Sequence, residues 1–465
     1  MKIISPVALL SLTLPFGSAL AQTSAALPTP SDSEIHKILV QRIDVEKKGV
    51  GIVVGIVSPE GRRIVAYGSL AKDDKRPLNG DTVFEIGSMT KVFTSLILMD
   101  MVQKGEVSLD DPVSKFLPSS VRVPERAGRK ISLKDLSTQS SGLPRMPTNF
   151  HPKNLLDPFA DYTVDQLYDF LSGYTLTCDI GEKYEYSNAG VGLLGIALSR
   201  KAGMDYETLV ATRILRPLDL KDTGVTLSPD QTARFAVGHS PALKVVPSWD
   251  HLPAFAGAGA LRSTGNDMLR FLAANLGFIK TPLASAMAAE VSVRRSTGTP
   301  NLEIAYAWLV LNAHGKPIYW HNGQTGGYHS FMGYSPATHV GVVVLSNVAS
   351  LTGIDDIGLH LLSPAFPLAT FAEHNEIAVD PKTLVGYAGE YQLMPNFIVT
   401  ITQSDGHLYA QATGQPKFGL FPEGRGKFFA KIAEITIAFQ SDAQGKTTEL
   451  VLHQMGRDMH AKRLK

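Results

Sequence analysis

The stretch EIGSMTKVFTSLILMDMVQKG, residues 85–105, places Ser88 three residues before Lys91 at the head of a long apolar run. Residues three apart share one face of a helix, so a helix starting at Ser88 brings the lysine amine beside the serine oxygen. A serine hydroxyl is a poor nucleophile near neutral pH unless a base or charge lies close by. The spacing therefore indicates an activated serine, although a serine N-cap followed by an unrelated lysine is the commoner source of this pattern.

A second motif lies in EKYEYSNAG, residues 182–190, where Tyr186 and Asn188 form a Y-x-N arrangement before a predicted helix. A tyrosine beside a cationic lysine should lose its proton more readily than a free phenol, whose pKa is about 10. Tyr186 would then exchange a proton with Ser88, and Asn188 would offer its amide to a substrate amide. The tripeptide alone is common, and a turn with a half-buried tyrosine explains it equally well.

A third motif lies in WHNGQTGGYHSF, residues 320–331, with His321, Asn322 and Gly323 at the end of a predicted strand. The glycine would let a substrate lie against the strand edge, and His321 would offer a charge or hydrogen bond to a substrate carboxylate. If His321 binds as imidazolium, its unperturbed pKa of about 6.5 predicts that carboxylate substrates are handled less well as pH rises through neutrality. The alternative is a glycine-rich strand end with a structural histidine.

Hydrophobic periodicity predicts an α/β domain around these motifs. Residues 50–68 read as two β-rich runs joined by SPEGRR, a hairpin signal, and strands return at residues 306–323 and 331–347. Helices are predicted from Ser88, at 188–202, at 206–214 and after the N-cap Thr264, where Asp267 nearly completes a capping box. Strands at both ends enclosing helices predict a sheet built from both ends of the domain.

The order S-x-x-K, Y-x-N, H-x-G resembles the penicillin-recognising serine hydrolases, which include class C β-lactamases, D-alanyl-D-alanine carboxypeptidases, D-aminopeptidases and family VIII esterases. The resemblance covers residues 33–366 and extends to FEIGSMTKVFTS, LDDPVSKFLP, ISLKDLSTQSSGLPR, GEKYEYSN, LRPLDLKDTG and GAGALRSTGNDM. It implies an α/β fold of the β-lactamase/transpeptidase type, with an antiparallel sheet flanked by helices and an added all-α region.

By this resemblance Ser88 is the acylated nucleophile, and Lys91 and Tyr186 form the proton-transfer pair. Which of the two is the base stays open. The oxyanion hole would be formed by the backbone N–H groups of Ser88 and Gln324. The substrate-binding residues implied in this way are Asn188, His321, Asn322, Gly323 and Gln324.

The implied function is hydrolysis of amide bonds of β-lactams or D-alanyl peptides through an acyl-enzyme. One departure bears on the substrate, because class C β-lactamases usually carry K-T-G where this chain has His321, Asn322 and Gly323. The H-x-G form is typical of carboxypeptidases, aminopeptidases and esterases. A family VIII carboxylesterase, a D-aminopeptidase and a penicillin-binding sensor that acylates with little turnover are therefore alternatives.

The chain changes character after the predicted hydrolase domain, residues 22–375. From about Asp380 it shows the short alternating runs FIVTITQ, HLYAQA, KFFAKI, EITIAFQ and ELVLHQ, separated by turn signals. Residues 376–465 are therefore predicted to form a small all-β barrel or sandwich. The pattern resembles the lipocalin-like β module appended to some members of the superfamily.

The first residues, MKIISPVALLSLTLPFGSALA, have one positive charge at Lys2, an apolar run and a small-residue ending. They predict a secretory signal peptide at residues 1–21, removed after Ala21, and a periplasmic or secreted protein. Without it the chain holds 43 basic residues, the 44 of the full sequence less Lys2, against 43 acidic ones. This balance gives no case for nucleic acid, and no further stretch approaches the ~20 apolar residues of a membrane span.

The expected partner is a small-molecule or peptidoglycan-derived substrate, and the oligomeric state is not predicted. We expect no metal and no cofactor, because no cluster has metal-ligand spacing and the family chemistry needs none. Cys178, the one cysteine, is read as a buried inert thiol. GVGLLG, residues 190–195, and GHSPA, residues 238–242, imitate dinucleotide and nucleophile-elbow motifs but lack the flanking elements that these motifs need.

Overall fold

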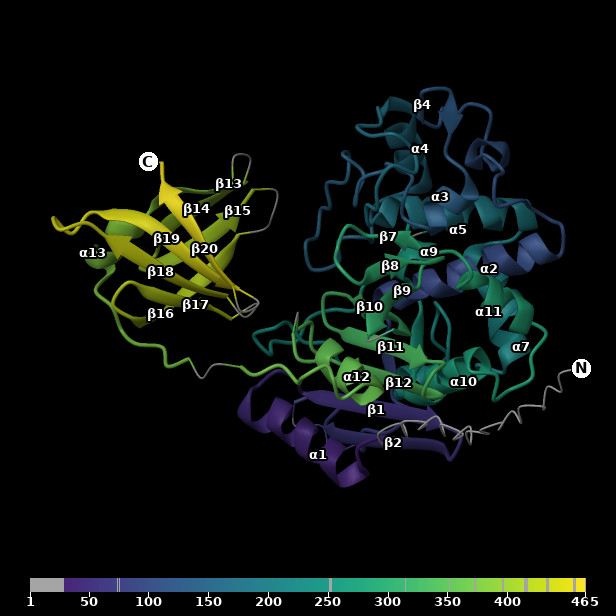
Figure 1. Ribbon diagram of the computed structural model, residues 1–465, viewed down its shortest axis with the longest axis horizontal. Helices are drawn as coiled ribbons and strands as arrows, with labels where there is room; N and C mark the ends of the chain where they lie inside the picture. Colours follow the sequence, from purple (N-terminus) through teal and green to yellow (C-terminus); the bar gives the residue numbers. More distant parts are fainter. Residues whose placement is uncertain are drawn as a thin grey trace, which may run out of the picture.

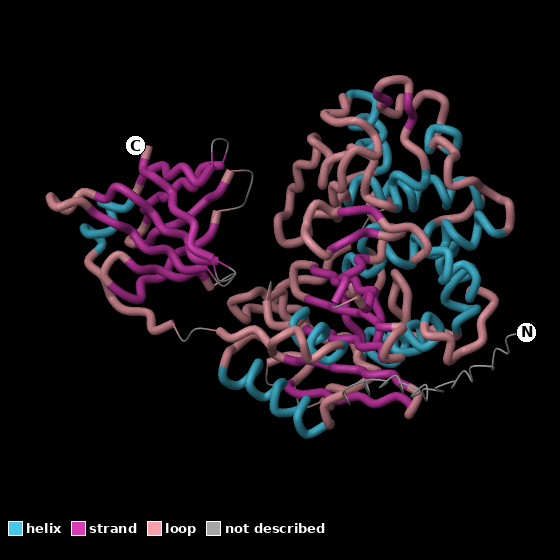
Figure 2. Tube along the Cα trace, viewed as in Figure 1, coloured by secondary structure: helices cyan, strands magenta, loops and turns pink. Residues whose placement is uncertain are grey.

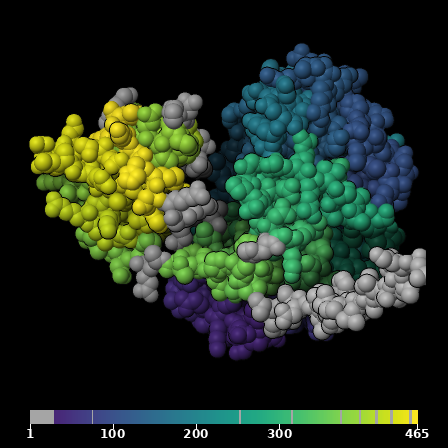
Figure 3. Space-filling model, in the orientation of Figure 1, coloured from purple at the N-terminus to yellow at the C-terminus, as the bar shows by residue number. Residues whose placement is uncertain are grey.

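The computed structural model describes residues 29–464, except for 73, 75, 251–252, 314, 351, 372–373, 395–396, 414–416, 432–434 and 455–456. The predicted signal peptide, residues 1–21, lies outside the described residues. The described chain forms an N-terminal α/β domain and a C-terminal β-barrel, which Figure 3 shows as a lobe of its own. No helix within these residues is long and apolar enough to cross a membrane.

The α/β domain is built on one eight-stranded sheet in which all neighbouring strands are antiparallel. In sheet order the strands are β2 (Gly61–Gly68), β1 (Gly51–Ser58), β12 (Val340–Ser346), β11 (His329–Ser335), β10 (Lys316–Gln324), β9 (Leu309–Ala313), β8 (Leu302–Ile304) and β7 (Arg295–Ser296). The predicted hairpin is confirmed as β1 and β2. Because β1 also pairs with β12, the sheet joins both ends of the domain, as predicted (Figure 1).

Helices cover both faces of this sheet (Figure 2). Ile52 of β1 packs in a cluster with α1 (Asp32–Val40) and α12 (Asp355–Leu362), whereas its neighbour Val53 packs in a larger cluster with α10 (Gly265–Asn275). Successive side chains of a strand point to opposite faces. A strand covered on both faces therefore reads as a continuous apolar run, which is what β1 shows.

The central helix of the domain is α2 (Thr90–Gln103), in which every residue from Thr90 to Met101 is buried. A helix that is apolar on all sides is a buried one, and this explains the long apolar run after Ser88. The remaining helices of the domain are α3 (Leu133–Ser137), α4 (Val164–Gly173), α5 (Asn188–Ala202), α6 (Tyr206–Val210), α7 (Arg216–Leu218), α8 (Pro229–Ala233), α9 (Ala256–Gly259) and α11 (Ala284–Glu290).

The predicted helix at residues 188–202 is confirmed as α5, and the GVGLLG glycines lie inside it. A Cβ on Gly192 would lie 2.3 Å from the Ala254 carbonyl oxygen, and one on Gly195 would lie 3.1 Å from the Gly257 Cα. The glycines therefore let α5 pack closely on its neighbours. The predicted helix at 206–214 begins as α6 and continues through a π-helical turn, η4 (Ala211–Leu215).

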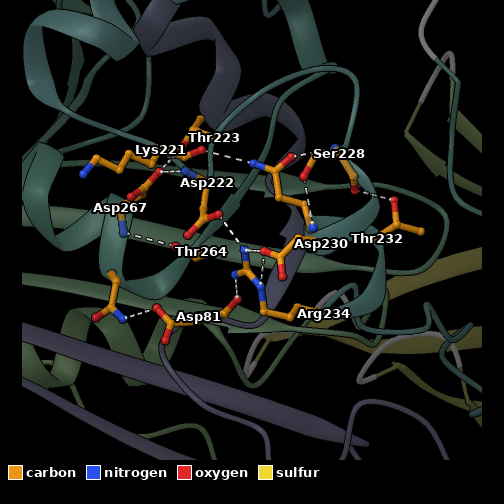
Figure 4. Close-up of polar contacts among 12 residues, drawn as sticks. Asp81, Lys221, Asp222, Thr223, Ser228, Asp230, Thr232, Arg234, Thr264 and Asp267 are labelled. Carbon is orange, nitrogen blue, oxygen red and sulfur yellow. Dashed lines mark hydrogen bonds and ion pairs between the residues drawn. The ribbon is translucent and has the colours of Figure 1, made fainter.

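Arg234 ties its loop to the chain on either side of it (Figure 4). Its guanidinium donates to the Asp81 carbonyl at 2.5 Å and to the Asp222 carboxylate at 2.6 Å. Its own carbonyl accepts from the Val83 N–H at 3.0 Å. Val83 opens the strand β3 (Val83–Glu85), so this network steadies the segment that leads into Ser88.

Thr264 caps α10 as predicted, because its hydroxyl accepts from the Asp267 N–H at 3.2 Å. The capping box is only half formed. The Asp267 carboxylate instead accepts from the Thr223 hydroxyl at 2.7 Å and the Asp222 N–H at 2.8 Å (Figure 4).

The C-terminal domain is a closed antiparallel barrel in which each strand pairs with the next and β20 returns to β13. Its strands are β13 (Gly389–Met394), β14 (Phe397–Ser404), β15 (His407–Ala412), β16 (Phe418–Gly424), β17 (Lys427–Ala430), β18 (Ile435–Ser441), β19 (Thr447–Gln454) and β20 (Arg457–Arg463). The predicted all-β module is confirmed, and its runs correspond to β14, β15, β17, β18 and β19. Strands β13, β16 and β20 were not predicted as separate runs.

Candidate active site

Ser88 lies in η2 (Gly87–Met89), a single turn of 3-10 helix between β3 and α2. The serine thus precedes the first α-helical residue by two positions instead of starting the helix. Gly87 has φ +48°, and a Cβ there would lie 2.8 Å from the Gln324 backbone nitrogen. Glycine is therefore required immediately before Ser88, both for the left-handed backbone and for the close approach of β10.

Lys91 lies one turn after Ser88 and is fully buried. Its Nζ donates to the Ser88 Oγ at 2.8 Å and to the Ala258 carbonyl at 2.7 Å. Burial, with the nearby charge of Arg145, holds the pKa of Lys91 well below its usual range. The Lys91 amine can therefore become neutral, and in that form it can accept a proton from Ser88.

Tyr186 precedes α5 and is brought to the same point. Its ring centroid lies 4.8 Å from the Lys91 Nζ and 4.9 Å from the Arg145 Cζ, and its hydroxyl bonds to Ser88. Burial raises the Tyr186 pKa, and the bond to Ser88 and the Arg145 charge offset this only in part. The expectation of an easily ionised tyrosine is therefore wrong for this structure, because removal of water disfavours the phenolate more than the neighbouring charges favour it.

Asn188 is the first residue of α5 and lines the same cavity as Ser88. Its N–H donates to the Arg145 carbonyl at 2.9 Å, and its side-chain nitrogen lies 3.5 Å from the Met146 sulfur. The preceding Ser187 caps α5 by accepting from the Gly190 N–H at 2.8 Å. The Y-x-N segment is thus fixed by its own helix cap and by the loop that ends at Arg145.

His321 is buried in β10, with its ring centroid 6.4 Å from that of Tyr186. Its Nδ1 donates to the Asn322 carbonyl at 2.6 Å. Burial, helped by the Lys91 charge, lowers the His321 pKa to about 4. The expectation of an imidazolium that holds a carboxylate near neutral pH is therefore wrong, since the ring is neutral there.

The Asn322 side chain is bound by Asp355, and Gly323 lies against the chain just before Ser88. The Asn322 amide donates to the Asp355 carboxylate at 2.6 Å. A Cβ on Gly323 would lie 1.9 Å from the Ile86 carbonyl oxygen and 2.6 Å from the Ser330 hydroxyl. The glycine therefore admits the chain just before Ser88, whereas the sequence suggested that it makes room for substrate.

Gln324 directs its backbone N–H toward the serine turn. The Thr325 N–H donates to the Tyr328 carbonyl at 3.1 Å, so Thr325 and Tyr328 form a hydrogen-bonded pair. Because the two kinds of pair alternate along an antiparallel ladder, the next pair, Gln324 and His329, is a non-hydrogen-bonded one. The N–H of such a residue points away from its partner strand. On that side lies Gly87, next to Ser88, which is the arrangement that an oxyanion hole needs.

Ser88 opens into a cavity of about 320 Å³, called the cleft below. Of the predicted site residues, Ser88, Asn188 and Gln324 line it. The full lining is Gly87, Ser88, Arg145, Met146, Phe150, Pro158, Phe159, Asn188, Trp249, Phe255, Ala258, Gly259, Gln324 and Thr325. Across the described residues, no group of three or more His, Cys, Asp or Glu side chains is placed to hold a metal ion.

Family models match both parts of the chain. The model described as Beta-lactamase matches residues 38–361, and one described as Domain of unknown function (DUF3471) matches residues 373–464. The chain belongs to the β-lactamase family. It is a serine hydrolase of the class C β-lactamase and D-alanyl-D-alanine carboxypeptidase type, and its C-terminal barrel is a DUF3471 domain.

Individual relatives agree with this membership. The chain is 29% identical over 330 residues to the D-alanyl-D-alanine-carboxypeptidase/endopeptidase AmpH of Escherichia coli, covering 66% of this chain and 83% of AmpH. It is 25% identical over 440 residues to penicillin-binding protein 4* of Bacillus subtilis, covering 88% and 94%. The structure of a β-lactamase/D-alanine carboxypeptidase from Yersinia pestis, 24% identical, superposes with a TM-score of 0.62 over 72% of this chain and 99% of that one, and shows the same fold.

Sequence reasoning missed several residues of this β-lactamase-family site. Arg145 ends the stretch ISLKDLSTQSSGLPR but was not singled out, and the aromatic wall comes from two loops that are distant in sequence. Glu85 was also missed, although it lies three residues before Ser88. It accepts from the Trp249 N–H at 2.8 Å, and burial raises its pKa to about 7. The feature of the sequence that could have revealed Glu85 is a charged residue at the end of an otherwise apolar strand.

Proposed function

We propose that Ser88 is the nucleophile of a periplasmic or secreted acyl-hydrolase that cleaves the amide bonds of β-lactams or D-alanyl peptides through a covalent ester. The proposal rests on one observation above all, the 2.8 Å contact between the Lys91 Nζ and the Ser88 Oγ at the edge of the cleft. The relatives support the substrate class, since one is named a D-alanyl-D-alanine-carboxypeptidase/endopeptidase and another a penicillin-binding protein. The predicted signal peptide supports the location.

In the acylation step, the Ser88 Oγ attacks the substrate carbonyl carbon while its proton passes to the neutral Lys91 amine. The lowered Lys91 pKa and the raised Tyr186 pKa both favour this direction over a tyrosinate base. The developing oxyanion accepts from the backbone N–H groups of Ser88 and Gln324. Asn188 holds the substrate amide from the opposite wall.

In the second half of acylation, the carbon–nitrogen bond breaks and the leaving nitrogen takes a proton. Tyr186, a neutral phenol bonded to Ser88, supplies this proton and regains one from protonated Lys91. The acyl group remains on Ser88 as an ester. Water then attacks the ester carbonyl, releases the acid and returns the proton to Ser88, with the same pair of residues moving protons in reverse.

The test is the mass of the intact protein after brief exposure to benzylpenicillin, followed by assays of nitrocefin hydrolysis and of D-alanine release from a peptide ending in D-alanyl-D-alanine. We expect one adduct on the wild type and none on Ser88→Ala. Ser58→Ala, at the end of β1, is the matched control and should acylate normally. An adduct that persists on Ser88→Ala would refute the assignment, and a stable adduct without turnover would identify a penicillin-binding sensor.

A carboxylesterase of the family VIII type is a second candidate, favoured by the neutral state of His321. A neutral ring gives no charge preference for a substrate carboxylate in the third motif. Comparing kcat/KM for para-nitrophenyl butyrate with that for the D-alanyl peptide and nitrocefin separates the two candidates. An esterase should favour the butyrate by orders of magnitude.

A further inference from the structure

Arg145 lies at the rim of the cleft, on the same wall as Asn188. Its carbonyl accepts from the Asn188 N–H at 2.9 Å and the Ala189 N–H at 3.4 Å, which fixes its backbone at the start of α5. Its guanidinium carbon lies 4.9 Å from the Tyr186 ring centroid. The side chain is exposed, so its charged end can meet a molecule that enters the cleft.

Arg145 has no acidic partner among the residues that the structure describes. Arg262, which contacts the Trp249 segment of the wall, is by contrast paired with Glu85 at 3.6 Å, and Arg129 is paired with Asp135 at 2.7 Å. Within the described lining of the cleft, Arg145 is the one charged residue. A guanidinium stays protonated throughout the working pH range, so the cleft carries an uncompensated positive charge.

The two other candidate cations near Ser88 are not available to a substrate anion. Lys91 is fully buried and already donates to Ser88 and Ala258. His321 is buried, lies outside the lining of the cleft and donates to the Asn322 carbonyl. Among the described residues that line the cleft, Arg145 is therefore the cationic side chain that an anionic group held close to the serine meets.

The remainder of the wall is apolar. Phe159 packs against Trp249 and Phe255 with ring centroids 5.1 Å apart in both cases, and Phe150 adds to the cluster at 5.5 Å. Such a surface suits the carbon skeleton of an acyl group. Asn188, whose backbone bonds to Arg145, is the residue proposed to hold the substrate amide, so the cation and the amide contact share one wall.

We infer that Arg145 is a specificity-determining residue that binds a carboxylate on the acyl part of the substrate, with the carbon chain of that acyl group lying along the aromatic wall. The inference rests on the proposed function of Ser88. A guanidinium presents paired N–H donors that match a carboxylate, which favours this group over a simple point charge. The class of substrate is thus an acyl donor that carries a negative charge beside the scissile bond.

The test uses three para-nitrophenyl esters with acyl chains of equal length. One ends in a methyl group (the pentanoate), one in a carboxylate (the glutarate monoester) and one in a trimethylammonium group. The measured quantity is the ratio of kcat/KM for the carboxylate ester to that for the pentanoate. Because Arg145 also acts on the pKa of Lys91, a ratio taken within each variant removes any general change in serine reactivity.

In Arg145→Gln we expect this ratio to fall by about tenfold, the usual scale for a lost charge-assisted hydrogen bond, mainly through KM. Arg145→Lys should recover part of it, and Arg145→Glu should favour the trimethylammonium ester. Arg62→Gln, which removes an exposed cation on β2, should leave the ratio unchanged. An unchanged ratio in Arg145→Gln would overturn the inference while leaving the serine chemistry intact. Ester hydrolysis that survives in Ser88→Ala would instead overturn the proposed function.

Discussion

The Lys91 amine lies 2.8 Å from the Ser88 hydroxyl oxygen, and no part of the lysine is exposed to solvent. An ammonium group in this position lacks the water that would stabilise its charge, so the amine is poised to take the serine proton. Tyr186 bonds to the same serine and stays protonated. In the mechanism that we propose, the three side chains form one proton path with a base at one end and a donor at the other.

Because Lys91 and Tyr186 share this path, their substitutions should not have additive effects. Lys91→Ala and Tyr186→Phe should each slow acylation by benzylpenicillin by at least ~100-fold, the usual scale for a positioned acid or base. The double variant should be little slower than the worse single one. Stopped-flow acylation rates measure this, and a double variant that shows the product of both losses would mean two independent paths.

His321 should make stability, and not substrate binding, depend on pH. Its folded pKa of about 4 lies below the unfolded value of about 6.5, so the unfolded chain binds more protons between these limits. The contribution of His321 to the free energy of unfolding is therefore complete above about pH 6.5. As pH falls toward 4, on the order of 3 kcal/mol of it is lost. Urea unfolding at several pH values should show this loss in wild type and not in His321→Gln.

The control for this prediction is His407→Gln, an exposed histidine of the barrel strand β15, which should keep the wild-type pH profile. The same neutral ring predicts that kcat/KM for a D-alanyl peptide does not fall as pH rises through about 6.5. A fall that disappears in His321→Gln would restore the imidazolium interpretation.

The sequence was sufficient where the signal was local. The Ser88 to Lys91 spacing, the β1–β2 hairpin and the helix that starts at Asn188 each depend on residues within one or two turns, and each lies where it was predicted. Strand β20 was missed because its residues are mostly polar and, of those whose burial the structure describes, only Ala461 is fully buried. A strand in a small barrel needs few inward apolar residues, so alternation is weak there.

The charge states of the site depend on the assembled fold and were beyond sequence reasoning. Tyr186 and His321 were given ordinary titration behaviour, whereas burial raises the pKa of the first and lowers that of the second. Burial comes from elements that are distant in sequence. The same reason hid Arg145, whose proposed role rests on its place in the lining of the cleft beside Tyr186.

Glu85 should couple pH to stability in the opposite sense from His321. Its folded pKa of about 7 lies above the unfolded value of about 4.3, so its contribution is complete below about pH 4 and is lost as pH rises through 7. The loss should be on the order of 3 kcal/mol. Glu85→Gln keeps an acceptor for the Trp249 N–H and should be more stable than wild type at about pH 8. Glu60→Gln, at an exposed position, is the control.

Gly323 should be indispensable to the geometry of the serine turn. In Gly323→Ala the new methyl group would lie 1.9 Å from the Ile86 carbonyl oxygen, so β10 or the turn must shift. We expect acylation to slow by ~100-fold or more, because displacements of about 1 Å at a reacting centre have effects of that size. Gly173→Ala, where a Cβ meets no atom within 4 Å, should acylate as wild type and unfold no more easily. Equal behaviour of the two variants would contradict the packing argument.

The two domains should be separable immediately after Phe371, because the contacts of the linker divide there. The Phe371 ring lies 4.6 Å from both the Arg42 guanidinium carbon and the Lys48 Nζ of the α/β domain. The His374 ring instead stacks on Phe429 of the barrel, with centroids 4.4 Å apart. We therefore expect the division slightly before the boundary between residues 375 and 376 that the sequence suggested.

A chain that ends after residue 371 should therefore fold and acylate with benzylpenicillin at the wild-type rate. A chain that ends after Leu362 loses Phe371 from between its two cations, so it should melt at a lower temperature. Residues 374–465 alone should fold as the barrel, since all eight strand pairings lie within them. Circular dichroism with thermal melting checks whether each of these three shortened chains folds and how stable it is. If the chain that ends after residue 371 fails to fold, the barrel is needed for the stability of the α/β domain. If that chain folds but acylates slowly, the barrel contributes to the cleft.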